Sequence, residues 1–318
     1  MITFSIITPA YNCQNTVEKC IRSVIQQSYE NYEMIVINDG STDNTVEIVK
    51  NVIIDVPKIQ LYNQENKGAS MARNYGLSLA KGDYIVFLDS DDYLEPDFLS
   101  VLNNAIQNHK TDIYFYGFNM VDDSGQIIKR KIPKIVSNDF DDTIISLKTN
   151  DMFGYTWIKA FKREVIQGVL FDSTMTLFED ELFVLNALGH CNSIQVLPVP
   201  IYNYRSNSIG LMSKTYQEYP ALKDKIYCRW HQYLDNKCDM FLLQIANSSL
   251  ASCYYYYLER QIDTKDFICM LKQTRFFKDA SESDFKEYVS KKRIRTLELL
   301  RFKYRMKNRI RKLVRRHS

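Results

Sequence analysis

Three carboxylates stand within four consecutive residues of this chain, in the segment Asp89-Ser90-Asp91-Asp92. Carboxylates so close together repel one another, so the segment favours a bound counter-ion. A hard divalent cation with oxygen ligands, Mg²⁺ or Mn²⁺, meets that need and commonly shares phosphate oxygens with a nucleotide. The alternative interpretation is a solvated acidic loop that caps the helix after it.

A second group of acids, Glu179, Asp180 and Glu181, stands before apolar residues that indicate a helix. Acids in the first turn of a helix are stabilised by the helix dipole, and on its own the pattern favours that interpretation. The chain shows no Ser/His/Asp or Cys/His arrangement for covalent catalysis. Neither its seven cysteines nor its four histidines have the spacing of a disulfide framework or a metal site.

The elements that position the first acidic segment follow from hydrophobic periodicity in the first 90 residues. Four short apolar runs predict buried strands, and three helical patterns separate them, which predicts βαβ units and a parallel sheet with helices on both faces. We expect strands at Phe4–Ile7, Met34–Ile37, Ile59–Leu61 and Tyr84–Leu88, and helices at Thr16–Gln27, Asp43–Ile54 and Ser70–Lys81.

A polar cluster follows each of these predicted strands, at residues 8–12, 38–43, 63–68 and 89–92. The carboxyl ends of parallel strands meet at one edge of a sheet, where open α/β sheets bind ligands. We therefore expect the four clusters to converge on a single binding edge. Thr42 or Asp43 is the expected N-cap of the second helix, and Gly82 the stop after the third.

The pattern changes after residue 95. We expect a helix from Pro96 to His109, a strand at Asp112–Gly117, a hairpin over Val121–Lys131, a helix at Glu179–Gly189, strands at Ile194–Val196 and Ile201–Tyr204, and helices from about Tyr216. The whole chain of 318 residues is 45% hydrophobic and 25% charged, which excludes collagen-like and largely disordered proteins. We expect neither a signal peptide nor a membrane span, and a cytoplasmic location.

The last residues, 291–318, hold 13 Lys or Arg and a single acid, Glu298. Apolar residues recur between them at roughly helical spacing from Leu297 to Val314, a pattern typical of an amphipathic helix on an anionic membrane surface. This predicts a peripheral association with the inner face of the plasma membrane. A solvated basic tail is the alternative, and nucleic acid is not an expected partner because no recognised binding module accompanies the charge.

Four motifs together carry a resemblance to a known family. TPAYN at 8–12, INDGSTDNT at 37–45, ENKGASMARNYGL at 65–77 and LDSDD at 88–92 resemble, in letters and spacing, the family 2 glycosyltransferases with the GT-A fold. Segments 157–161, 178–183 and 202–205 are similar to bacterial members that build capsular, exo- and lipopolysaccharides. The resemblance implies a Rossmann-like, mostly parallel sheet in a catalytic domain at 1–215, a helical region at 216–290 and the basic tail at 291–318.

The resemblance also implies a UDP-sugar site and an Mn²⁺ or Mg²⁺ ion. Asp91 would bind the metal with Asp92 as an auxiliary ligand, Asp89 would face the ribose, and Asp39 would accept the imide N–H of uracil unless it only stabilises a turn at Gly40. The other residues expected around the donor are Pro9, Ala10, Tyr11, Glu18, Lys67, Arg73, Ser90 and Arg205. A surface role is the alternative for Arg73, and a packing or surface role is the alternative for Arg205.

For the reaction, the resemblance implies that Asp180, with Glu179 as second choice, takes the proton from an acceptor hydroxyl in a direct displacement that inverts the anomeric centre. Trp157 and Lys159 would contact a saccharide acceptor, which the basic tail favours as lipid-linked; core packing is the alternative for Trp157. Ile226 replaces the Gln of the QxxRW signature of processive synthases, which favours transfer of one sugar. The alternative function is a non-catalytic sugar-nucleotide or partner-binding module on the same scaffold.

Overall fold

The computed structural model describes residues 1–134, 139–206, 218–234 and 273–282, together with eight residues between 241 and 253. Contacts divide the chain into two units, Met1–Gly210 and Leu211–Ser318. The second unit contains helices α7 (Tyr219–Leu234) and α10 (Arg275–Glu282). The expected boundary at residue 215 and the basic tail at 291–318 lie outside the described residues and remain predictions.

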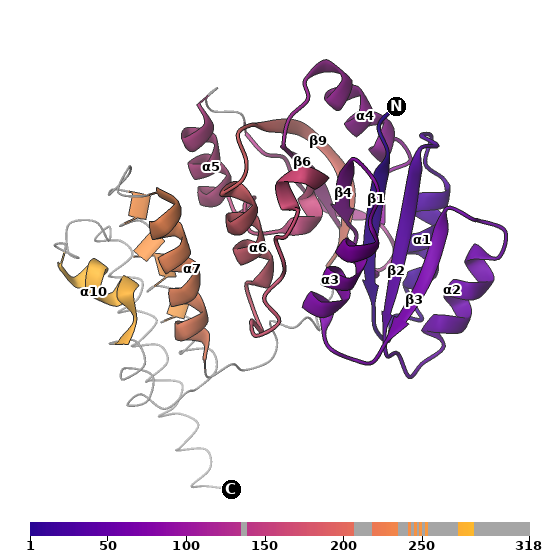
Figure 1. The fold of residues 1–318 in the computed structure, drawn as a ribbon, viewed down its shortest axis with the longest axis horizontal. Coiled ribbons are helices and arrows are strands. Elements are labelled where there is room, and N and C mark those ends of the chain that lie inside the picture. The colour runs from indigo at the N-terminus through magenta and orange to yellow at the C-terminus, as the bar shows by residue number, and fades with distance from the viewer. Residues whose placement is uncertain are drawn as a thin grey trace, which may run out of the picture. The chain divides into compact units, whose positions relative to one another are not determined.

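The first unit is built on one nine-stranded sheet with the order β3-β2-β1-β4-β8-β6-β9-β5, in which β7 pairs with β6 (Figure 1). The four strands predicted in the first 90 residues are present, mutually parallel, and extend to the polar clusters that follow them. Their bounds are β1 (Phe4–Ala10), β2 (Tyr32–Asp39), β3 (Ile59–Gln64) and β4 (Tyr84–Phe87).

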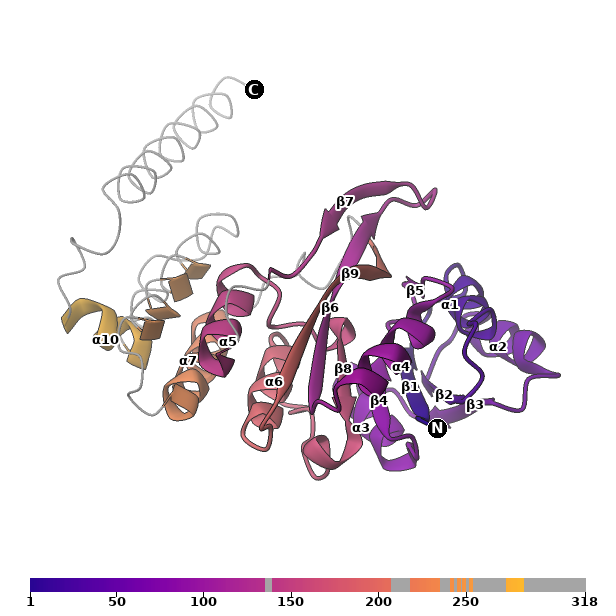
Figure 2. The same cartoon turned by 90° about the horizontal axis from the view of Figure 1, so that it is seen from above.

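Helices cover both faces of this part of the sheet (Figure 2). The chain moves outward from β1 to β3 through α1 (Val17–Ile25) and α2 (Thr45–Ile53), and α3 (Ala69–Leu79) returns it past β1 to β4. Right-handed crossovers therefore place α3 on the face opposite α1 and α2. The predicted N-cap of α2 was wrong, because Asn44 takes that position, although Asp43 Oδ1 accepts the backbone N–H of Thr45.

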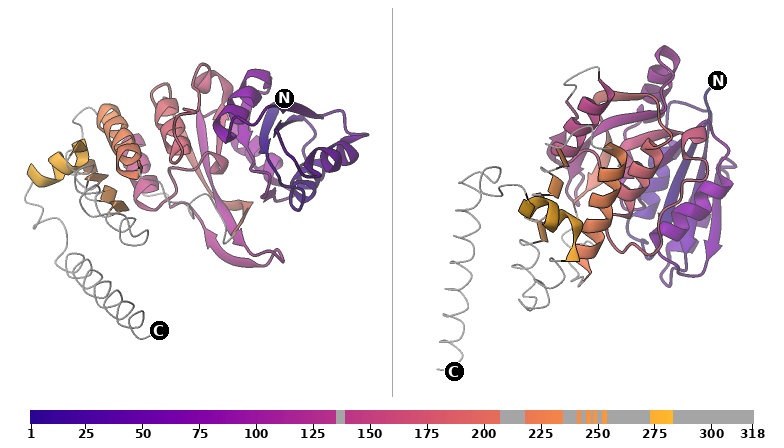
Figure 3. Two further views of the ribbon diagram at one scale, coloured as in Figure 1. Left: turned by 90° about the horizontal axis from the view of Figure 1, so that it is seen from below. Right: turned by 60° about the vertical axis from the view of Figure 1, so that its left-hand side comes forward.

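The later strands make the sheet mixed. The Val121–Lys131 hairpin is confirmed and extends beyond the rest of the sheet (Figures 2 and 3), whereas 194–196 and 201–204 form one strand instead of two. That strand shifts register near Pro200, and a bulge is where a strand tolerates proline. The bounds are β5 (Tyr93–Leu94), α4 (Phe98–Asn108), β6 (Ile113–Val121), β7 (Ile127–Lys131), α5 (Phe140–Thr149), η1 (Thr156–Ile158), β8 (Lys159–Lys162), η2 (Arg163–Ile166), α6 (Glu179–Leu188) and β9 (Ile194–Arg205).

Strands β5 and β8 were not anticipated from the sequence. Both are short and pair antiparallel, β8 between β4 and β6, and β5 with β9. Strand β8 brings residue 159 and the η1 turn before it beside the end of β4, so the second half of the chain completes the binding edge. None of the described helices is long and apolar enough to cross a membrane.

Helix α3 lies directly against β1 because Gly76 has no side chain. A methyl group added at Gly76 would lie 2.4 Å from Cγ2 of Ile7, a residue with no exposed surface. Alanine at this position should therefore push α3 away from the sheet, although alanine is the better helix former.

We expect Gly76→Ala to lower the free energy of unfolding by about 1–3 kcal/mol, the usual cost of overpacking a core. Urea denaturation followed by circular dichroism measures the change. Ser78→Ala, on the exposed side of the same helix, is the matched control and should leave the midpoint unchanged or slightly higher. Equal midpoints for the two variants would contradict this account of the packing.

Candidate functional site

The loops after β1, β2 and β3 are tied to one another by hydrogen bonds at one edge of the sheet. Asn12 Oδ1 accepts the backbone N–H of Thr42 at 2.8 Å, which joins the first two loops. Asp39 accepts the backbone N–H groups of Lys67 at 2.8 Å and Gly68 at 2.9 Å, which joins the second and third. The convergence expected from the parallel sheet is therefore present for these three loops.

Asp39 is buried at the end of β2, and its carboxylate organises the loop that leads into α3. Besides the two backbone groups, its Oδ1 accepts Nε2 of Gln64 at 2.7 Å. A carboxylate offers about four acceptor positions, so three of them are occupied and one is left for a ligand N–H group. These hydrogen bonds of Asp39 hold residues 67 and 68. They therefore do not support the alternative role, in which Asp39 only stabilises a turn at Gly40.

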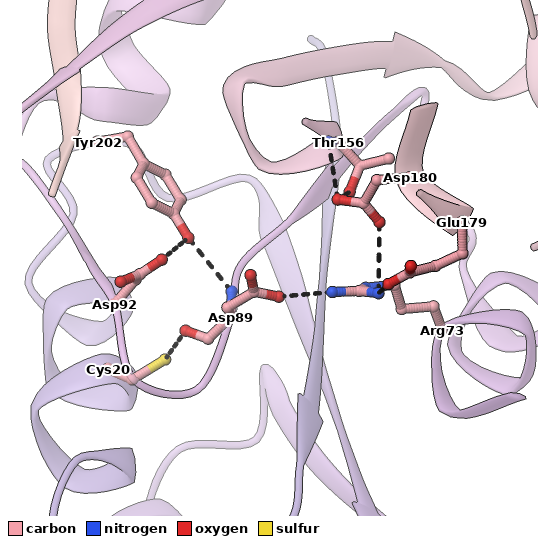
Figure 4. Close-up of polar contacts among 8 residues, drawn as sticks. All are labelled: Cys20, Arg73, Asp89, Asp92, Thr156, Glu179, Asp180 and Tyr202. Carbon is pink, nitrogen blue, oxygen red and sulfur yellow. Dashed lines mark hydrogen bonds and ion pairs between the residues drawn. The ribbon is translucent and has the colours of Figure 1, made fainter. Parts of the chain in front are cut away.

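Arg73, on α3, joins the two acidic segments (Figure 4). Its Nη2 donates to Asp89 Oδ1 at 2.9 Å, and its Nη1 lies 3.4 Å from Asp180 Oδ1 and 3.5 Å from Glu179 Oε1. The side chain is 7% exposed and packs over the ring of Phe171. The surface interpretation of Arg73 was therefore wrong, and a single buried cation faces three carboxylates.

These charges govern one another's protonation. Burial by itself would lower the pKa of Arg73, but the charges of Asp180, Asp89 and Glu179 outweigh it and raise that pKa. Burial raises the pKa of Glu179, and the neighbouring Asp180 charge adds to the effect while Arg73 opposes it. The cluster therefore holds more negative charge than its one arginine neutralises, which favours an additional cation.

Asp180 is held from two sides at the start of α6. Its Oδ2 accepts both the backbone N–H of Thr156 at 3.2 Å and the Thr156 hydroxyl at 2.9 Å, while its Oδ1 faces Arg73. Phe178, immediately before α6, has a φ of 65°, which is the left-handed region that non-glycine residues rarely adopt. Such a conformation near acidic residues is typical of a functional site.

The structure gives Asp92 a different position from that of an auxiliary metal ligand. Its Oδ2 accepts the hydroxyl of Tyr202 at 2.7 Å and its Oδ1 accepts the backbone N–H of Arg205 at 2.7 Å. Burial raises the pKa of Asp92 well above its usual range, and the charges of Asp91 and Asp89 add to the effect. Asp92 thus fixes the acidic loop to β9, and Tyr202 also accepts the N–H of Asp89 at 3.3 Å.

Asp91 and Asp89 are consequently the acids of this loop with partly exposed side chains. Within the part of the chain that the structure describes, no group of three His, Cys, Asp or Glu residues is arranged to hold a metal ion. A divalent ion at this loop would thus need other oxygen ligands. Phosphate oxygens and waters commonly supply them for Mg²⁺, with only one or two carboxylates from the protein.

The remaining residues expected around a nucleotide lie along the same edge with different exposures. Tyr11 is 50% exposed just beyond β1, whereas Ala10 is buried. Glu18 lies on the exposed side of α1 in an ion pair with Arg22. Pro9, Ser90 and Arg205 are half-buried and Lys67 is exposed.

The two residues expected to contact an acceptor are buried. Trp157 is 5% exposed and stacks on Tyr202 and Tyr204, with ring centroids 4.8 Å and 5.2 Å away, which supports the packing interpretation. Lys159 has no exposed surface, so a direct contact to an acceptor does not fit its position. Tyr155, which packs against Trp157 and is 39% exposed, presents the aromatic surface instead.

Thr156 and the hydroxyl of Tyr202 were missed as site residues by the sequence analysis. Each acts through a hydroxyl group on an acid from another part of the chain, Asp180 for Thr156 and Asp92 for Tyr202. A hydroxyl in a strand or turn has no spacing that marks its partner. Tyr202 stands in a segment that carried part of the family resemblance, and that was the one signal available.

Glu179 gives a pH-dependent prediction. Its pKa is raised above the ordinary 4.5, so its ionisation costs more in the folded protein than in the unfolded chain. We expect Glu179→Gln to be more stable than the unmodified protein at pH 7.5. The advantage should shrink as pH falls through the raised pKa and vanish below about 4.5, where both forms are neutral.

Chemical denaturation at a series of pH values measures this difference. Glu181→Gln is the matched control on the same helix turn, since Glu181 forms an ion pair with Lys148 and its loss should destabilise the protein at pH 7.5. If Glu179→Gln were less stable than the unmodified protein at pH 7.5, the attraction between Glu179 and Arg73 would outweigh the cost of burying the charge of Glu179. The upward shift assigned to the pKa of Glu179 would then be wrong.

The chain is similar to several known proteins. EpsJ of Bacillus subtilis, described as an uncharacterized glycosyltransferase, is 28% identical over 228 residues, which are 70% of this chain and 66% of EpsJ. The chain thus spans just under two thirds of that relative's length. S. aureus TarS residues 1–349 in complex with UDP-GlcNAc superposes with a TM-score of 0.69 at 21% identity, covering 85% of this chain and 80% of TarS 1–349.

A mannosyltransferase from Pyrobaculum calidifontis, PcManGT in complex with GDP-Man and Mn²⁺, has a TM-score of 0.53 at 12% identity over 90% of this chain and 87% of that one. At such identities, these two structures establish the GT-A fold. Residues 5–170, more than half of the chain, match the family described as Glycosyl transferase family 2. Because this match covers more than half of the chain, the chain belongs to glycosyl transferase family 2.

Proposed function

We propose that this protein is an inverting, metal-dependent glycosyltransferase that moves one sugar from a UDP-sugar to a hydroxyl group of a saccharide acceptor in cell-surface polysaccharide synthesis. The observation that carries the proposal is the position of Arg73. One buried guanidinium contacts Asp89 on the nucleotide side and Asp180 and Glu179 on the other side. The residue expected at the donor and the residues expected to act as the catalytic base would thus contact the same arginine side chain.

Buried polar atoms without hydrogen bonds support a ligand between these two ends. Nε and Nη1 of Arg73 and Oδ1 of Asp180 are buried and make no hydrogen bond within the described residues, although Nη1 and Oδ1 face each other as an ion pair at 3.4 Å. Buried polar atoms without hydrogen bonds are costly, so a polar ligand that supplies acceptors to Arg73 would be stabilised here. A diphosphate or the hydroxyl groups of a sugar have that chemistry.

For the nucleotide, the fourth acceptor position of Asp39 fits the imide N–H of uracil, and Tyr11, just beyond the neighbouring strand β1, is 50% exposed. The UDP-GlcNAc complex of TarS, which shares the fold, is consistent with a uridine donor. Asp89, Ser90, Lys67 and Arg205 would then meet the ribose and the diphosphate.

The acidic loop fits a divalent ion that arrives with the diphosphate. Asp91 would hold it, with Asp89 beside it, and Asp92 would act through the loop without contacting the ion. When bound, Mn²⁺ or Mg²⁺ would neutralise charge that develops on the departing UDP. The Mn²⁺ in the PcManGT complex supports this choice of ion for the fold.

Asp180 accepts the proton of the acceptor hydroxyl as that oxygen attacks the anomeric carbon. The new carbon–oxygen bond forms while the bond from the anomeric carbon to the β-phosphate oxygen breaks, and UDP leaves with that electron pair. Attack from the face opposite the leaving group inverts the anomeric centre. Holding the donor, acceptor and base together supplies much of the rate.

The acceptor site would lie on the Asp180 side, where Tyr155 presents an exposed ring on which the apolar face of a sugar can pack. A lipid-linked saccharide at the inner face of the plasma membrane is the acceptor that the basic tail favours. That tail lies outside the described residues, so this part of the proposal rests on the sequence pattern alone.

The metal site is tested by Asp91→Asn. Titration calorimetry with UDP in the presence of Mn²⁺ should show binding for the unmodified protein and a loss of at least about tenfold in affinity for the variant, because a neutral amide is a weaker ligand for the ion. Asp97→Asn, at an exposed acid before α4, should bind as the unmodified protein does. No heat with either protein would remove the donor-site assignment.

The base is tested by Asp180→Asn. Binding of UDP and Mn²⁺ should stay within about twofold, while turnover with whichever UDP-sugar the unmodified protein uses should fall by 10²-fold or more, as expected for loss of a general base. A near-normal rate would make another residue the base. Donor binding without turnover of any UDP-sugar by the unmodified protein would instead favour the non-catalytic alternative.

A further inference from the structure

Lys159 is a lysine without exposed surface in the wall of the candidate site. Its Nζ donates a hydrogen bond to the backbone carbonyl of Tyr155 and lies 4.7 Å from the ring centroid of Phe115 and 5.8 Å from that of Phe153. Burial lowers the pKa of Lys159 well below its usual range. Taking an amine out of water is costly, so the hydrogen bond from Lys159 to the carbonyl of Tyr155 needs an explanation.

The carbonyl held by Lys159 belongs to the residue before Thr156, at the start of the η1 turn. Thr156 is itself fully buried and gives both its backbone N–H and its hydroxyl to Asp180 Oδ2. The hydroxyl of Tyr116 donates to the carbonyls of Trp157 at 2.9 Å and Lys159 at 3.3 Å. The turn that carries Thr156 is thus fixed on both sides of that residue.

Asp180 needs such a support because Arg73 lies on its other side. The Oδ1 atom of Asp180 is 3.4 Å from Arg73 Nη1, longer than a charge-assisted hydrogen bond. The χ2 torsion of an aspartate is soft, and a carboxylate beside a guanidinium favours a bidentate pair with it. Without Thr156, Asp180 would be free to rotate into that pair, and both of its oxygens would then be occupied by Arg73.

We propose that Thr156, and through it Lys159, are positioning residues that hold the Asp180 carboxylate away from a bidentate pair with Arg73. The inference deepens the proposed function, because it concerns the same base. It also gives Lys159 a role different from the contact with an acceptor that the family resemblance implied.

A crystal structure of Thr156→Val tests the geometry without any assumption about the reaction. Valine keeps the shape and the backbone N–H group and removes the hydroxyl. We expect the carboxylate to rotate so that both oxygens lie within hydrogen-bond distance of Arg73, and to return to its place in Thr156→Ser. An unmoved carboxylate in the valine variant would overturn the proposal.

Kinetics test the consequence in the active protein. Thr156→Val should lower kcat by about 10- to 100-fold, the usual effect of a misplaced catalytic group, with the KM for the UDP-sugar within about twofold. Thr156→Ser should recover most of the rate. A loss of kcat that serine does not rescue, or a change confined to KM, would contradict a positioning role.

Lys159→Met, which keeps the length of the side chain, tests the indirect path. It should lower kcat less than Thr156→Val does, and the double variant should be no slower than Thr156→Val alone, since both changes act on one carboxylate. Additive losses of kcat in the double variant would show that Lys159 does not act through Asp180. Calorimetry with UDP and Mn²⁺ on the same proteins distinguishes these results from failure of the proposed donor site, which would abolish binding in every protein, the unmodified one included.

A separate observation concerns β7, which among the described strands pairs with β6 alone and whose residues 127–130 are exposed. Ile127, Ile128 and Ile132 are 41%, 59% and 45% exposed. The basic side chains among them form no ion pair with a described acid: Lys129, Arg130, Lys131 and Lys134. Lysines at an open strand edge discourage pairing with other strands, which accounts for the charges but leaves the three exposed isoleucines unexplained.

We infer that β7 is a contact site for an anionic lipid bilayer. Cations at the headgroups with apolar side chains in the interface are what such a surface selects. The hairpin turn would also bring the bilayer close to the acidic loop, because a Cβ added at Gly125 would lie 3.5 Å from the hydroxyl of Tyr93, the residue after Asp92.

Flotation of the full chain with phosphatidylglycerol/phosphatidylcholine vesicles tests this contact. Lys129→Glu/Arg130→Glu should reduce vesicle affinity by about tenfold or more, and Ile128→Ser should reduce it with no change of charge. Lys50→Glu/Lys81→Glu, an equal charge change at exposed positions elsewhere, is the control and should have little effect. Equal losses in the two charge variants would overturn the proposal, as would an equal loss of binding to a soluble polyanion such as heparin.

Discussion

The guanidinium of Arg73 is the interaction on which the site depends. It is nearly fully buried, and its neighbours are carboxylates from the end of β4 and from the start of α6. Breaking a buried ion pair leaves an uncompensated charge, which is far more costly than loss of a surface pair. The two acidic segments, about 90 residues apart in the sequence, therefore hold their positions because one cation stands between them.

Around that centre, each acid has a different task set by its surroundings. Asp39 accepts three hydrogen bonds from groups of its own sheet edge and keeps one acceptor position open, and Asp92 is turned inward to Tyr202 and β9. Asp180 keeps one oxygen buried without a hydrogen bond. Residues of one type and one charge thus differ in how many of their oxygen atoms are occupied, and the hydrogen bonds that each one receives set that difference.

The parts of this site that could be predicted from sequence are those set by local pattern. Alternating strand and helix periods give the four parallel strands, and polar residues at strand ends then converge for topological reasons. The roles of Asp92 and Lys159 could not be predicted in this way. Asp92 is fixed by Tyr202, 110 positions later, and Lys159 is buried because β8 inserts between β4 and β6, an arrangement without a local signal. Arg73 falls between these cases, since its helix was predicted but its burial was not.

The way α3 begins has one more consequence. Asp39 fixes Gly68, the residue that caps α3, and Arg73 follows five residues later on that helix. An α-helix rises about 1.5 Å and turns about 100° with each residue, so this stretch sets both the distance and the rotation between Gly68 and Arg73. A single residue inserted there would rotate Arg73 by about 100° around the helix axis, away from Asp89 and Asp180. An insertion elsewhere in the loops of this edge would leave the spacing between Gly68 and Arg73 unchanged.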